Sequence, residues 1–559
     1  MTDGAAASLT ARQWLVLVAL SLVLFVPGLF AVPPLDRDEA RFAQASRQML
    51  ESGDWVDIRF QDEARHKKPI GIYWLQAGAV ALTGQGPDAG IWAYRLPSQA
   101  GAVAAVLLTA WAGTALFGAA AGFAAALVMA GTLLLGVEAR LAKTDAVLLA
   151  FTLLAQGALA RVWLAARDGR APPRGMALLF WAAEGAAILV KGPIAPLAAI
   201  ATVLVASAFD RRRADGHGRW YWLRALRPLT GGGLAALIVL PWLVAITIAT
   251  DGAFFREAVG HDLLGKVAGG QESHGAPPGY YLATFWVTFW PFAPLAGLAL
   301  PWVIARRREP AVLFCLGWIV PFWLLFEAIT TKLPHYTLPV LPAVALLAAA
   351  ALAAGFAGRK GPVRGLARLW PLILGAVVSL ALAAGFVAAL WLPAAPGALP
   401  WIGLGALAAL CAGGLLVAGV WLRRPRLTLA GPLAAMAVTA VAGWQGVVPA
   451  LEPVWLAPRI AAAVAAHRRC GDSVLAAANF TEPSLVFLTG TATRLGPPEA
   501  AAAHLRADPR CGLALVDARD RATFEGALGG VAALPLATID GFNYARGQRL
   551  SLGLYRLAP

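Results

Sequence analysis

Long and nearly uncharged apolar runs fill most of the first 450 residues of this chain. The first of them, at about residues 12–32, is long enough to cross the hydrocarbon core of a bilayer. A soluble protein would carry roughly 25% charged residues and would show its apolar positions in periodic stripes. Only 14% of this sequence is charged. The runs therefore predict a polytopic α-helical membrane protein and exclude a soluble enzyme.

Thirteen such runs are predicted to be membrane-spanning helices. They lie at about residues 12–32, 96–117, 119–136, 141–165, 176–190, 193–208, 230–249, 281–304, 311–329, 335–356, 370–393, 401–422 and 428–448. The first run is longer than the apolar part of a typical signal peptide and lacks a clear A-x-A end, so we interpret it as an uncleaved helix. An odd number of spans places the two ends of the chain on opposite sides of the membrane.

Arginine and lysine residues indicate which side is which. Five alternate loops hold clusters of them, at residues 161–174, 211–227, 306–308, 359–368 and 423–426. Cytoplasmic loops of membrane proteins carry this excess of basic residues. We therefore expect a multi-pass protein with a cytoplasmic N-terminus and a C-terminal region on the outer side of the membrane. This arrangement also explains the net charge of +15 without any nucleic-acid partner.

The composition changes after about residue 450. The segments 473–478 and 512–517 have the apolar pattern of buried strands, and 482–488 begins a helix with a proline in its first turn. The segment 542–557 contains a glycine turn between apolar runs, which indicates a hairpin. These elements predict a small α/β domain.

The predicted organisation is a transmembrane domain at residues 1–450, with an outer first loop at 33–95, followed by an outer α/β domain at 451–559. Cys470 and Cys511 both belong to the second domain. They could pair as a disulfide in an oxidising compartment.

Ionisable residues gather on the predicted outer side of the membrane. The first outer loop, 36–69, holds eight acidic and seven basic residues. Further charged groups lie in the outer segments 138–145, 191–193, 251–280 and 331–336. Charged groups near hydrocarbon are costly, so their convergence on one side of the membrane indicates a functional site there.

Asp38 and Arg41 are three residues apart at the start of a helical stretch and share one helix face. They could simply cap that helix, with Glu39 beside Asp38, since acidic residues favour a helix N-terminus. The functional interpretation is a carboxylate base beside a cation that binds phosphate. Asp145 is either a buried carboxylate or an interface residue paired with Lys143 or Arg140.

The cations on the predicted outer rim are Arg41, Lys68, Lys191, Lys332 and Lys266. A lysine at a membrane interface usually contacts lipid headgroups. So many cations at one level nevertheless suit an anionic group on a lipid, most simply a phosphate. A carboxylate beside them suits general-base chemistry on an acceptor hydroxyl. The sequence contains no P-loop, GxSxG or zinc motif, so it gives no support for NTP hydrolysis or serine acylation.

Several segments together resemble bacterial aminoarabinose transferases that act on lipid A, which are relatives of the protein O-mannosyltransferases. They are Asp36-Arg-Asp-Glu-Ala-Arg41 with the helix that follows it, Lys68-Pro-Ile-Gly-Ile-Tyr-Trp74, Arg95-Leu-Pro-Ser98, Leu189-Val-Lys-Gly-Pro193, Lys332-Leu-Pro-His-Tyr336, Glu482-Pro-Ser-Leu-Val-Phe-Leu488 and Gly541-Phe-Asn-Tyr-Ala-Arg-Gly547. The likeness covers nearly the whole chain, and the segments follow the family's order.

The resemblance implies a GT-C glycosyltransferase of the bacterial inner membrane, with a periplasmic first loop, catalytic face and C-terminal domain. It also implies an undecaprenyl-phosphate-linked sugar donor and inversion at the anomeric carbon. It makes Asp38, Asp145 and Glu39 the candidate catalytic carboxylates. The matching positions for binding the substrate and its phosphate are Arg41, Lys68, Lys191, Lys266, Lys332, Tyr336 and His261.

The chain departs from the family at one position. In aminoarabinose transferases a glutamate precedes the lysine of the Lys-Pro pair and joins a histidine at a metal site. Here that position is Lys67, with His66 before it. An ammonium group cannot ligate a cation, so we expect no metal and no other cofactor.

The expected activity is transfer of a sugar to an envelope acceptor, either a lipid A phosphate or another glycan, with protein O-mannosylation as an alternative. A lipid-linked sugar flippase or transporter is the alternative from a different class. A transporter needs a polar route through the bilayer, often with broken helices at its midplane. Within the predicted spans only Glu184 lies deep. The expected partners are therefore the lipid-linked donor, the acceptor and the membrane lipids.

Overall fold

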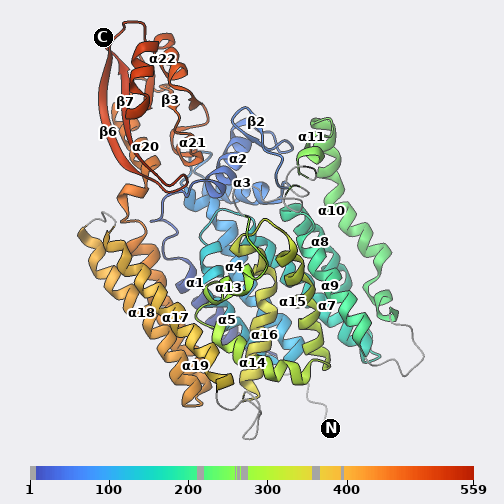
Figure 1. Cartoon of the computed structure of the whole chain (residues 1–559). Helices are drawn as coiled ribbons and strands as arrows, with labels where there is room; N and C mark the ends of the chain where they lie inside the picture. The colour runs from blue at the N-terminus through green and yellow to red at the C-terminus, as the bar shows by residue number, and fades with distance from the viewer. Residues whose placement is uncertain are drawn as a thin grey trace.

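Helices make up most of the structure, as the apolar runs predict (Figure 1). The computed structural model describes residues 8–210, 220–258, 260, 265, 275–355, 366–391 and 396–558. A long helical bundle carries, at one end, two helices of the first loop and a small domain that contains a β-sheet. We call this end of the bundle the domain end.

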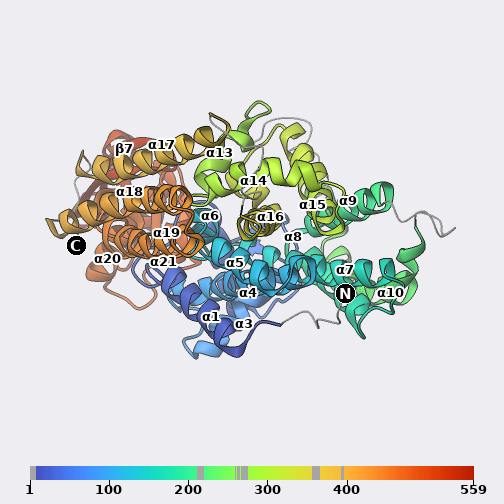
Figure 2. The same cartoon turned by 90° about the horizontal axis from the view of Figure 1, so that it is seen from below.

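The bundle consists of helices that follow the predicted spans in order. They are α1 (Ala11–Phe25), α4 (Ile91–Phe117), α5 (Ala119–Ala130), α6 (Leu133–Glu138), α7 (Asp145–Arg167), α8 (Met176–Lys191), α9 (Ile194–Phe209), α10 (Pro228–Ala249), α13 (Tyr280–Thr288), α14 (Ala293–Arg306), α15 (Pro310–Ala328), α16 (Leu341–Ala353), α17 (Leu366–Ala388), α18 (Leu399–Trp421) and α19 (Pro425–Ala440). Both views place α17 and α18 at one side of the bundle and α9 and α10 at the other (Figures 1 and 2).

Fewer helices than the predicted thirteen are long enough to span a membrane by themselves. Among the described residues eight helices meet that criterion, or nine when the bent pair α13 and α14 counts as one span. The predicted spans at α1, α5, α8 and α9 form helices of only 12 to 16 residues. The chain is nevertheless a multi-pass membrane protein.

The predicted span 281–304 is wrong as a continuous helix. Its two halves, α13 and α14, meet at an angle of 120°. Pro291 and Pro294 lie at the junction, and proline lacks the N–H that continues a helical hydrogen-bond ladder. The apolar pattern alone does not reveal this break, because both halves are equally apolar.

Small residues allow the central helices to approach one another closely. A Cβ atom added at Gly113 of α4 would lie 2.6 Å from the Cα of Gly122 in α5. In α4, Gly101 faces the backbone of Ala146 in α7 in the same way, where an added Cβ would lie 2.8 Å from the backbone carbon. In a membrane, where lipid tails are as apolar as the helices, such close packing supplies much of the association energy.

The first loop forms α2 (Asp38–Ser52) and α3 (Gly71–Thr83), joined through the short strands β1 (Arg59–Phe60) and β2 (Glu63–Ala64). Two acids stand in the first turn of α2, where the helix dipole favours negative charge. Figure 1 shows α2 and α3 lying across the domain end of the bundle, beside the C-terminal domain.

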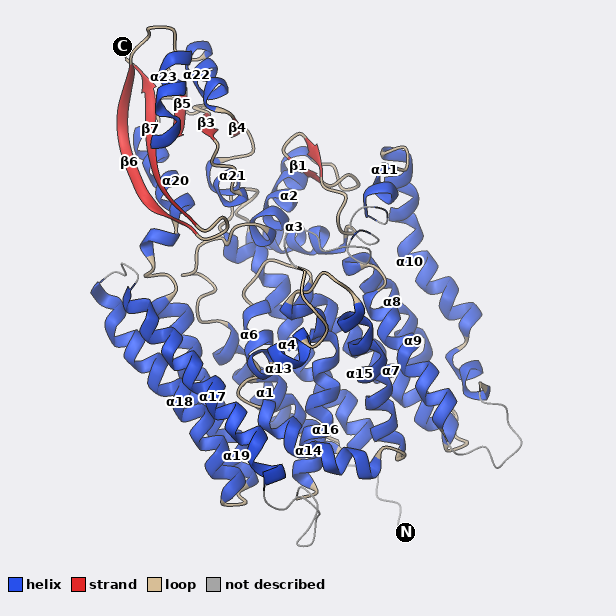
Figure 3. Cartoon of the chain, viewed as in Figure 1, coloured by secondary structure: helices blue, strands red, loops and turns tan. Residues whose placement is uncertain are grey.

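The C-terminal domain contains a five-stranded sheet with helices packed against it (Figure 3). The elements are α20 (Leu456–His467), β3 (Leu475–Ala478), α21 (Pro483–Thr489), β4 (Arg494–Gly496), α22 (Pro498–Ala507), β5 (Leu513–Asp517), α23 (Arg521–Ala527), β6 (Ala533–Asn543) and β7 (Gln548–Leu557). The strand order is β4-β3-β5-β7-β6, with β3 parallel to β4 and β5, and β7 antiparallel to β5 and β6. The predicted strands and hairpin are confirmed.

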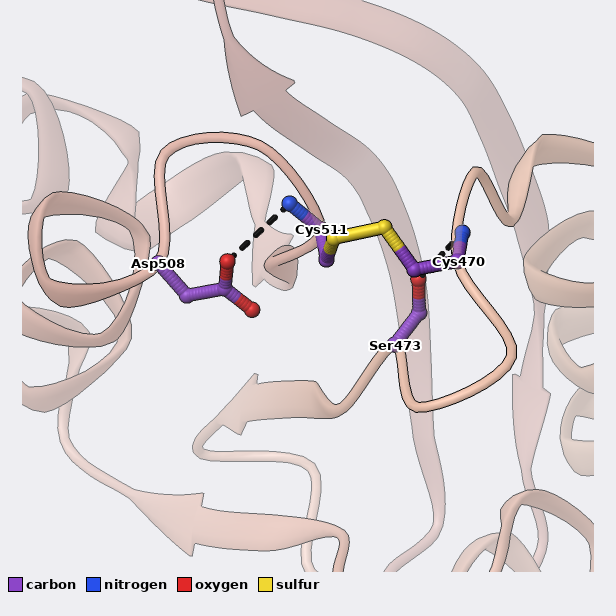
Figure 4. The surroundings of a disulfide bond; sticks show 4 residues. All are labelled: Cys470, Ser473, Asp508 and Cys511. Atoms are coloured by element: carbon purple, nitrogen blue, oxygen red, sulfur yellow. Dashed lines mark hydrogen bonds between the residues drawn. A yellow bond between two sulfur atoms is a disulfide. The ribbon is translucent and has the colours of Figure 1, made fainter.

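Cys470 and Cys511 form a disulfide, which confirms the pairing that the sequence left open (Figure 4). Their Cα atoms lie 5.6 Å apart, and the bond joins the end of α20 to the start of β5. Backbone hydrogen bonds fix both ends, from Cys470 N–H to Ser473 Oγ and from Cys511 N–H to Asp508 Oδ1. Asp472 lies near both sulfur atoms, but sulfurs bonded to each other are not thiolate ligands for a metal.

The C-terminal domain packs directly on α2. The ring of Phe487, in α21, inserts among first-loop residues and meets Tyr94 edge-on at 5.3 Å between ring centroids. Arg47 of α2 donates a hydrogen bond of 2.9 Å to the carbonyl of Phe487 and pairs with Asp88 at 2.5 Å. A buried aromatic ring and a shared guanidinium therefore join the two parts.

A second set of contacts reaches the residues just before α2. Asp36 N–H donates to Tyr544 Oη over 2.7 Å, and its carboxylate accepts hydrogen bonds from the hydroxyl and backbone N–H of Ser484. Arg37 Nη2 donates to the carbonyl of Ala545 over 2.6 Å. The turn of the β6–β7 hairpin thus lies against the segment that leads into Asp38.

Candidate active site at the domain end of the bundle

Asp145 and Lys191 form the closest ion pair of the site. Asp145 is the first residue of α7 and Lys191 is the last residue of α8, so both helix dipoles favour these charges at these positions. Lys191 Nζ lies 2.5 Å from Asp145 Oδ1, and Lys143 Nζ lies 3.7 Å from Asp145 Oδ2. Of the two partners expected for Asp145, Lys143 is confirmed. Arg140 instead donates to backbone carbonyls and lies over the ring of Trp444.

Glu138 and His335 extend this cluster. Lys143 Nζ lies 3.2 Å from Glu138 Oε1, so this lysine bridges the two carboxylates Glu138 and Asp145. The imidazole of His335 lies between the same two carboxylates, 3.9 Å from Glu138 and 3.8 Å from Asp145. Ionisable groups from α6, α7, α8 and the segment after α15 therefore meet at one place.

Asp38 begins α2 and faces this cluster from the first loop. Its side chain is exposed, which leaves it accessible to a substrate. Burial by surrounding groups acts to raise its pKa, but the positive charges of Lys143, Arg65 and Lys68 outweigh that effect and hold the pKa below its ordinary value of 3.8. Asp38 is therefore ionised at neutral pH, as an acceptor of protons must be.

The same electrostatics act on Lys143. Burial favours its neutral form, but Glu138, Asp145 and Asp38 together raise its pKa above the ordinary value. Lys143 thus remains a cation among three carboxylates, and it connects Asp38 with the Asp145–Lys191 pair.

Arg65 is a member of the site that the sequence does not single out. It is 8% exposed, and its guanidinium lies 4.9 Å from the centre of the Phe42 ring. Its Nε has no hydrogen-bond partner among the described residues. A buried guanidinium N–H without a partner is rare, so this donor is free to bind an acceptor.

The structure also positions the remaining predicted cations. Lys68 is partly buried and donates to the carbonyl of Lys67 over 3.0 Å, and its charge acts on Asp38. Arg41 is partly buried on α2; its backbone N–H donates to the carbonyl of Arg37, and its side chain forms no hydrogen bond or ion pair in the described part of the chain. Tyr336 lies with its ring 5.7 Å from Lys191 Nζ, in a cation–π contact, and its edge meets His335.

Glu39 has a different position from its neighbour Asp38. It is 2% exposed and accepts both ends of a bidentate pair from Arg95, at 2.8 and 2.9 Å. The backbone N–H groups of Leu35 and Ala142 also donate to it. The rest of the Arg95 guanidinium binds carbonyls of residues 29–33. Since its oxygens are fully occupied, Glu39 braces the first loop, and a catalytic role for it has no structural support.

Lys332 also differs from the prediction. Its three ammonium protons point at the carbonyls of Phe326, Glu327 and Ile329, at 3.1, 2.8 and 2.6 Å. It is buried and closes the C-terminal end of α15, where a positive charge is favoured. With all three donors used, Lys332 stabilises that helix end and does not offer a free ammonium to a phosphate.

His261 and Lys266 lie outside the described residues, so their predicted contribution stays a prediction. Glu184 is buried in α8, and neither of its carboxylate oxygens has a hydrogen-bond partner within the described ranges. It lies away from the charged cluster described above.

The residues present do not fit the metal site that the family resemblance implies. Lys67 brings an ammonium to the position of a carboxylate ligand, and the adjacent His66 imidazole is held by Asp57 at 2.8 Å. We therefore base no chemical step on a metal.

Several members of the charged cluster are not predicted by the sequence. Glu138 and His335 stand in segments already noted as outer and charged, but nothing in their spacing connects them with Asp145. Arg65 looked like one of seven bases in a mixed loop. Only the packing of residues 334–340 against α6 and α7 brings His335 to Glu138 and Asp145, and only the fold of the first loop brings Arg65 near Asp38.

Comparison with known proteins shows which protein families this chain resembles. Residues 67–244 match the family described as dolichyl-phosphate-mannose-protein mannosyltransferase. An undecaprenyl phosphate-alpha-4-amino-4-deoxy-L-arabinose arabinosyl transferase from Pseudomonas aeruginosa (strain LESB58) is 32% identical over 346 residues. That alignment covers 59% of this chain and 59% of the relative, so the similarity spans less than two thirds of either protein. A transferase of the same name from Edwardsiella ictaluri is 29% identical over 392 residues, 68% of this chain and 65% of its own.

Solved structures match over a larger share of the chain. The crystal structure of ArnT from Cupriavidus metallidurans bound to undecaprenyl phosphate has a TM-score of 0.71 at 20% identity and covers 97% of this chain and 98% of its own. The archaeal oligosaccharyltransferase AglB from Archaeoglobus fulgidus has a TM-score of 0.54 at 11% identity, over 98% of this chain and 74% of its own. These likenesses show the fold. The predicted resemblance is confirmed: the chain has the GT-C fold of membrane glycosyltransferases and is similar in sequence to the aminoarabinose transferases and to the protein mannosyltransferase family.

Proposed function

We propose that this protein is an inverting membrane glycosyltransferase that moves a sugar from an undecaprenyl-phosphate-linked donor to an acceptor in the cell envelope. One observation carries the proposal: an exposed, ionised Asp38 stands at the end of a hydrophobic bundle among cations that lower its pKa. A carboxylate in such a setting suits proton abstraction, and the surrounding cations suit a lipid phosphate.

The phosphate of the donor would bind to the cations that face Asp38. Arg41 can turn to a phosphate without breaking a side-chain hydrogen bond or ion pair to any described residue, and the unpartnered Nε of Arg65 offers a further donor. Lys68 adds positive charge on the same side. Guanidinium and ammonium groups bind phosphate through charge-assisted hydrogen bonds. The polyprenyl tail would remain in the bilayer beside the bundle.

In the reaction, the acceptor oxygen forms a bond to the anomeric carbon while the bond from that carbon to the phosphate oxygen breaks. The electron pair of the broken bond stays on the phosphate, where the cations stabilise the developing charge. Attack from the side opposite the leaving phosphate inverts the anomeric centre. If the acceptor is a hydroxyl, its proton passes to Asp38. If the acceptor is a phosphate oxygen, it is already ionised, and Asp38 orients it.

Asp145 and Lys191 hold this arrangement in place. Their 2.5 Å ion pair fixes the ends of α7 and α8. The positive charge of Lys143 interacts with both Asp145 and Asp38, and so connects this pair with Asp38. The tyrosine ring of Tyr336 covers Lys191 and restricts its movement. We therefore assign Asp145 a positioning role beside the base Asp38.

The sequence relatives favour an aminoarabinose-type sugar as the donor group and lipid A as the acceptor, because the named relatives are undecaprenyl phosphate-aminoarabinose transferases. The match of residues 67–244 to the protein mannosyltransferase family favours a protein acceptor as the second candidate. Both candidates use the same donor chemistry and the same base.

We further propose that the domain end faces the periplasm of a bacterial inner membrane and that the N-terminus is cytoplasmic. Arg167, Arg306 and Arg423 stand at the ends of helices opposite to the domain end, as the basic cytoplasmic loops of membrane proteins do. The disulfide of the C-terminal domain agrees with an oxidising compartment on the other side.

Mass spectrometry of envelope glycolipids and glycoproteins tests the proposed function. Cells that make the unaltered protein would be compared with cells that make Asp38→Asn, which keeps the shape of the side chain and removes its charge. Asp62→Asn is the matched control, because Asp62 is an exposed acid of the same loop. Loss of a defined sugar mass from lipid A in Asp38→Asn alone supports the aminoarabinose-type reaction, and the lost mass identifies the sugar.

Other outcomes separate the alternatives. A loss on protein or on another glycan keeps the reaction and replaces the acceptor. Unchanged glycans with Asp38→Asn, in cells shown to contain the protein, contradict the transferase and favour a transporter of lipid-linked sugars.

A further inference from the structure

A separate cavity of about 280 Å³ opens in the C-terminal domain. It lies where β3 and β5 end, beside the turn of the β6–β7 hairpin. Asn479 and Phe480 follow β3, and Arg519 and Asp520 follow β5. None of these residues belongs to the charged cluster around Asp38.

The topology of the sheet places this cavity where binding sites recur. β3 lies between β4 and β5 in the sheet. After β3 the chain passes through α21 to β4 on one side, and after β4 it crosses back to form β5 on the other side of β3. The segments that leave the adjacent parallel strands β3 and β5 therefore run in opposite directions, which leaves a crevice between them. In open α/β sheets, ligands bind in the crevice outside the carboxyl ends of the strands at such a switch point.

The polar groups around the cavity are planar and are held in fixed orientations. Asn479 Nδ2 donates to Asp520 Oδ2 over 2.9 Å, and Asn479 adopts a left-handed backbone conformation with φ 59°. Arg519 Nε lies 2.7 Å from Asp517, which is buried at the end of β5. Gln548 is exposed at the start of β7 and carries a further amide.

The charges of the cavity balance. Arg519 pairs with Asp517, and Arg546 pairs with Glu482 at 3.4 Å. Each guanidinium that borders the cavity therefore already faces a carboxylate. An anion would have to compete with those carboxylates, whereas an uncharged group rich in hydroxyls could accept from the guanidinium and amide N–H groups and donate to the carboxylates at once.

The wall of the cavity provides an apolar surface for the same ligand. Leu550 and Leu552 of β7 line it, together with the buried ring of Phe480. A sugar ring has hydroxyl groups at its edge and C–H groups on its faces, which suits a polar rim above apolar side chains. The volume falls just below the roughly 300–1,000 Å³ of sites for drug-sized ligands and suits a small ring.

We propose that this cavity is a carbohydrate-binding site that holds an uncharged sugar unit of the acceptor glycan. Binding of the sugar stands on the cavity alone, whereas its identity as part of the acceptor rests on the proposed transferase function. The hairpin turn connects the cavity with the catalytic loop, since Asn543 and Arg546 border the cavity while Tyr544 and Ala545 contact residues 36 and 37. A glycan held there lies against the segment that leads into Asp38.

Saturation-transfer NMR on the full chain tests the site, in a detergent without a sugar headgroup so that the micelle cannot compete. The probe is N-acetylglucosamine at a concentration on the order of 10 mM, which detects weak binding. Asn479→Gly removes the amide and keeps the left-handed backbone available, and Gln548→Ala removes the second amide. Each change should lower the affinity about tenfold, as the loss of ligand hydrogen bonds predicts. Arg521→Ala, at an exposed arginine of the same domain outside the cavity, should leave the affinity unchanged.

Three results would overturn the proposal. They are the absence of saturation transfer with the unaltered protein, transfer that persists in both cavity variants, and displacement of the sugar by inorganic phosphate at equal concentration, which would show an anion site. Asp38→Asn should retain the sugar signal, and loss of the signal in that variant would place the sugar at the catalytic cluster instead. If the protein is no transferase, the binding result is unaffected. If it is one, Asn479→Gly should raise the KM for the acceptor and leave kcat unchanged.

Discussion

Lys191 Nζ lies 2.5 Å from Asp145 Oδ1, and this single contact joins the C-terminal end of α8 to the N-terminal end of α7. The side chains of Asp145 and Lys191 are only 5% and 13% exposed. A buried carboxylate that loses its partner keeps the full cost of its desolvation.

We predict that Lys191→Met and Asp145→Asn each destabilise the protein by roughly 3–5 kcal/mol, whereas the double variant loses clearly less than the sum. Thermal unfolding of the four proteins in detergent measures this coupling. Additive losses would show that the two charges act independently, contrary to the geometry.

The variants Glu39→Gln and Asp38→Asn should show that Glu39 supports stability and that Asp38 acts as the base, although the two residues are neighbours. Glu39→Gln leaves the Arg95 guanidinium without its buried counter-charge, so we expect a loss of stability of about 3 kcal/mol. Asp38→Asn should leave the unfolding temperature nearly unchanged and abolish transfer. Parallel measurements of unfolding and single-turnover rate check both. A Glu39→Gln protein with full stability and no activity would restore the catalytic role.

Lys332→Met and Lys68→Met form a second matched pair. Lys332 caps α15 with all three donors, so its loss should lower the unfolding temperature and leave the KM for the lipid-linked donor unchanged. Lys68→Met should raise that KM at least tenfold, since its charge lies on the phosphate side of Asp38. Kinetics with varied donor concentration give both values, and the reverse pattern would return Lys332 to the binding site.

The contact between the C-terminal domain and the first loop should weaken as the pH rises from 4 to 6. Burial raises the pKa of Asp36 from 3.8 to about 6, with Glu482 adding to the rise and hydrogen bonds from Ser484 opposing it. Between these values the folded protein holds a proton that the unfolded chain has released, so stability falls with rising pH in this window and is constant above it. The expected loss over this window is about 3 kcal/mol.

Hydrogen exchange of α21 at pH 5 and pH 8 measures this effect, because opening of the contact exposes its amides. In Asp36→Asn the side chain no longer titrates, and the exchange protection should lose this pH dependence. A dependence that survives in Asp36→Asn would assign the titration to another group.

Reduction of the disulfide should destabilise the C-terminal domain. The bond closes a loop with a sequence separation of 41, for which chain entropy predicts about 4 kcal/mol. The Cys470→Ser, Cys511→Ser double variant should therefore expose the domain to limited proteolysis while the helix bundle resists. Control samples with Cys315→Ser should behave as the unaltered protein, since that thiol is buried in the bundle.

The helical bundle could be predicted because uniform apolarity is a property of the sequence itself. The break between α13 and α14 could not, since it arises from two prolines whose effect depends on what packs around them. The lengths of α1 and α5 also escaped, because the apolar run continues through residues that do not form helix.

The candidate site could also be predicted from the sequence only in part. Asp38, Asp145 and Lys191 were found because an ionisable group at a span end is unusual wherever it occurs. Glu39 and Lys332 looked equally unusual, and only their hydrogen bonds reveal that each is saturated by local backbone or by Arg95. Arg65 and His335 join the site through contacts between segments that are distant in the sequence, and a single sequence does not reveal such contacts.

The contacts of Asp36 with Ser484 and Tyr544 join residues that are 448 and 508 positions apart. A ribosome makes the first loop near the beginning of synthesis and the groups that brace it near the end. The loop therefore lacks its final support until the last segment of the chain has been translated and has folded around its disulfide. A nascent or prematurely terminated chain would present the bundle without a braced first loop, so that the proposed sugar transfer could take place only in finished molecules.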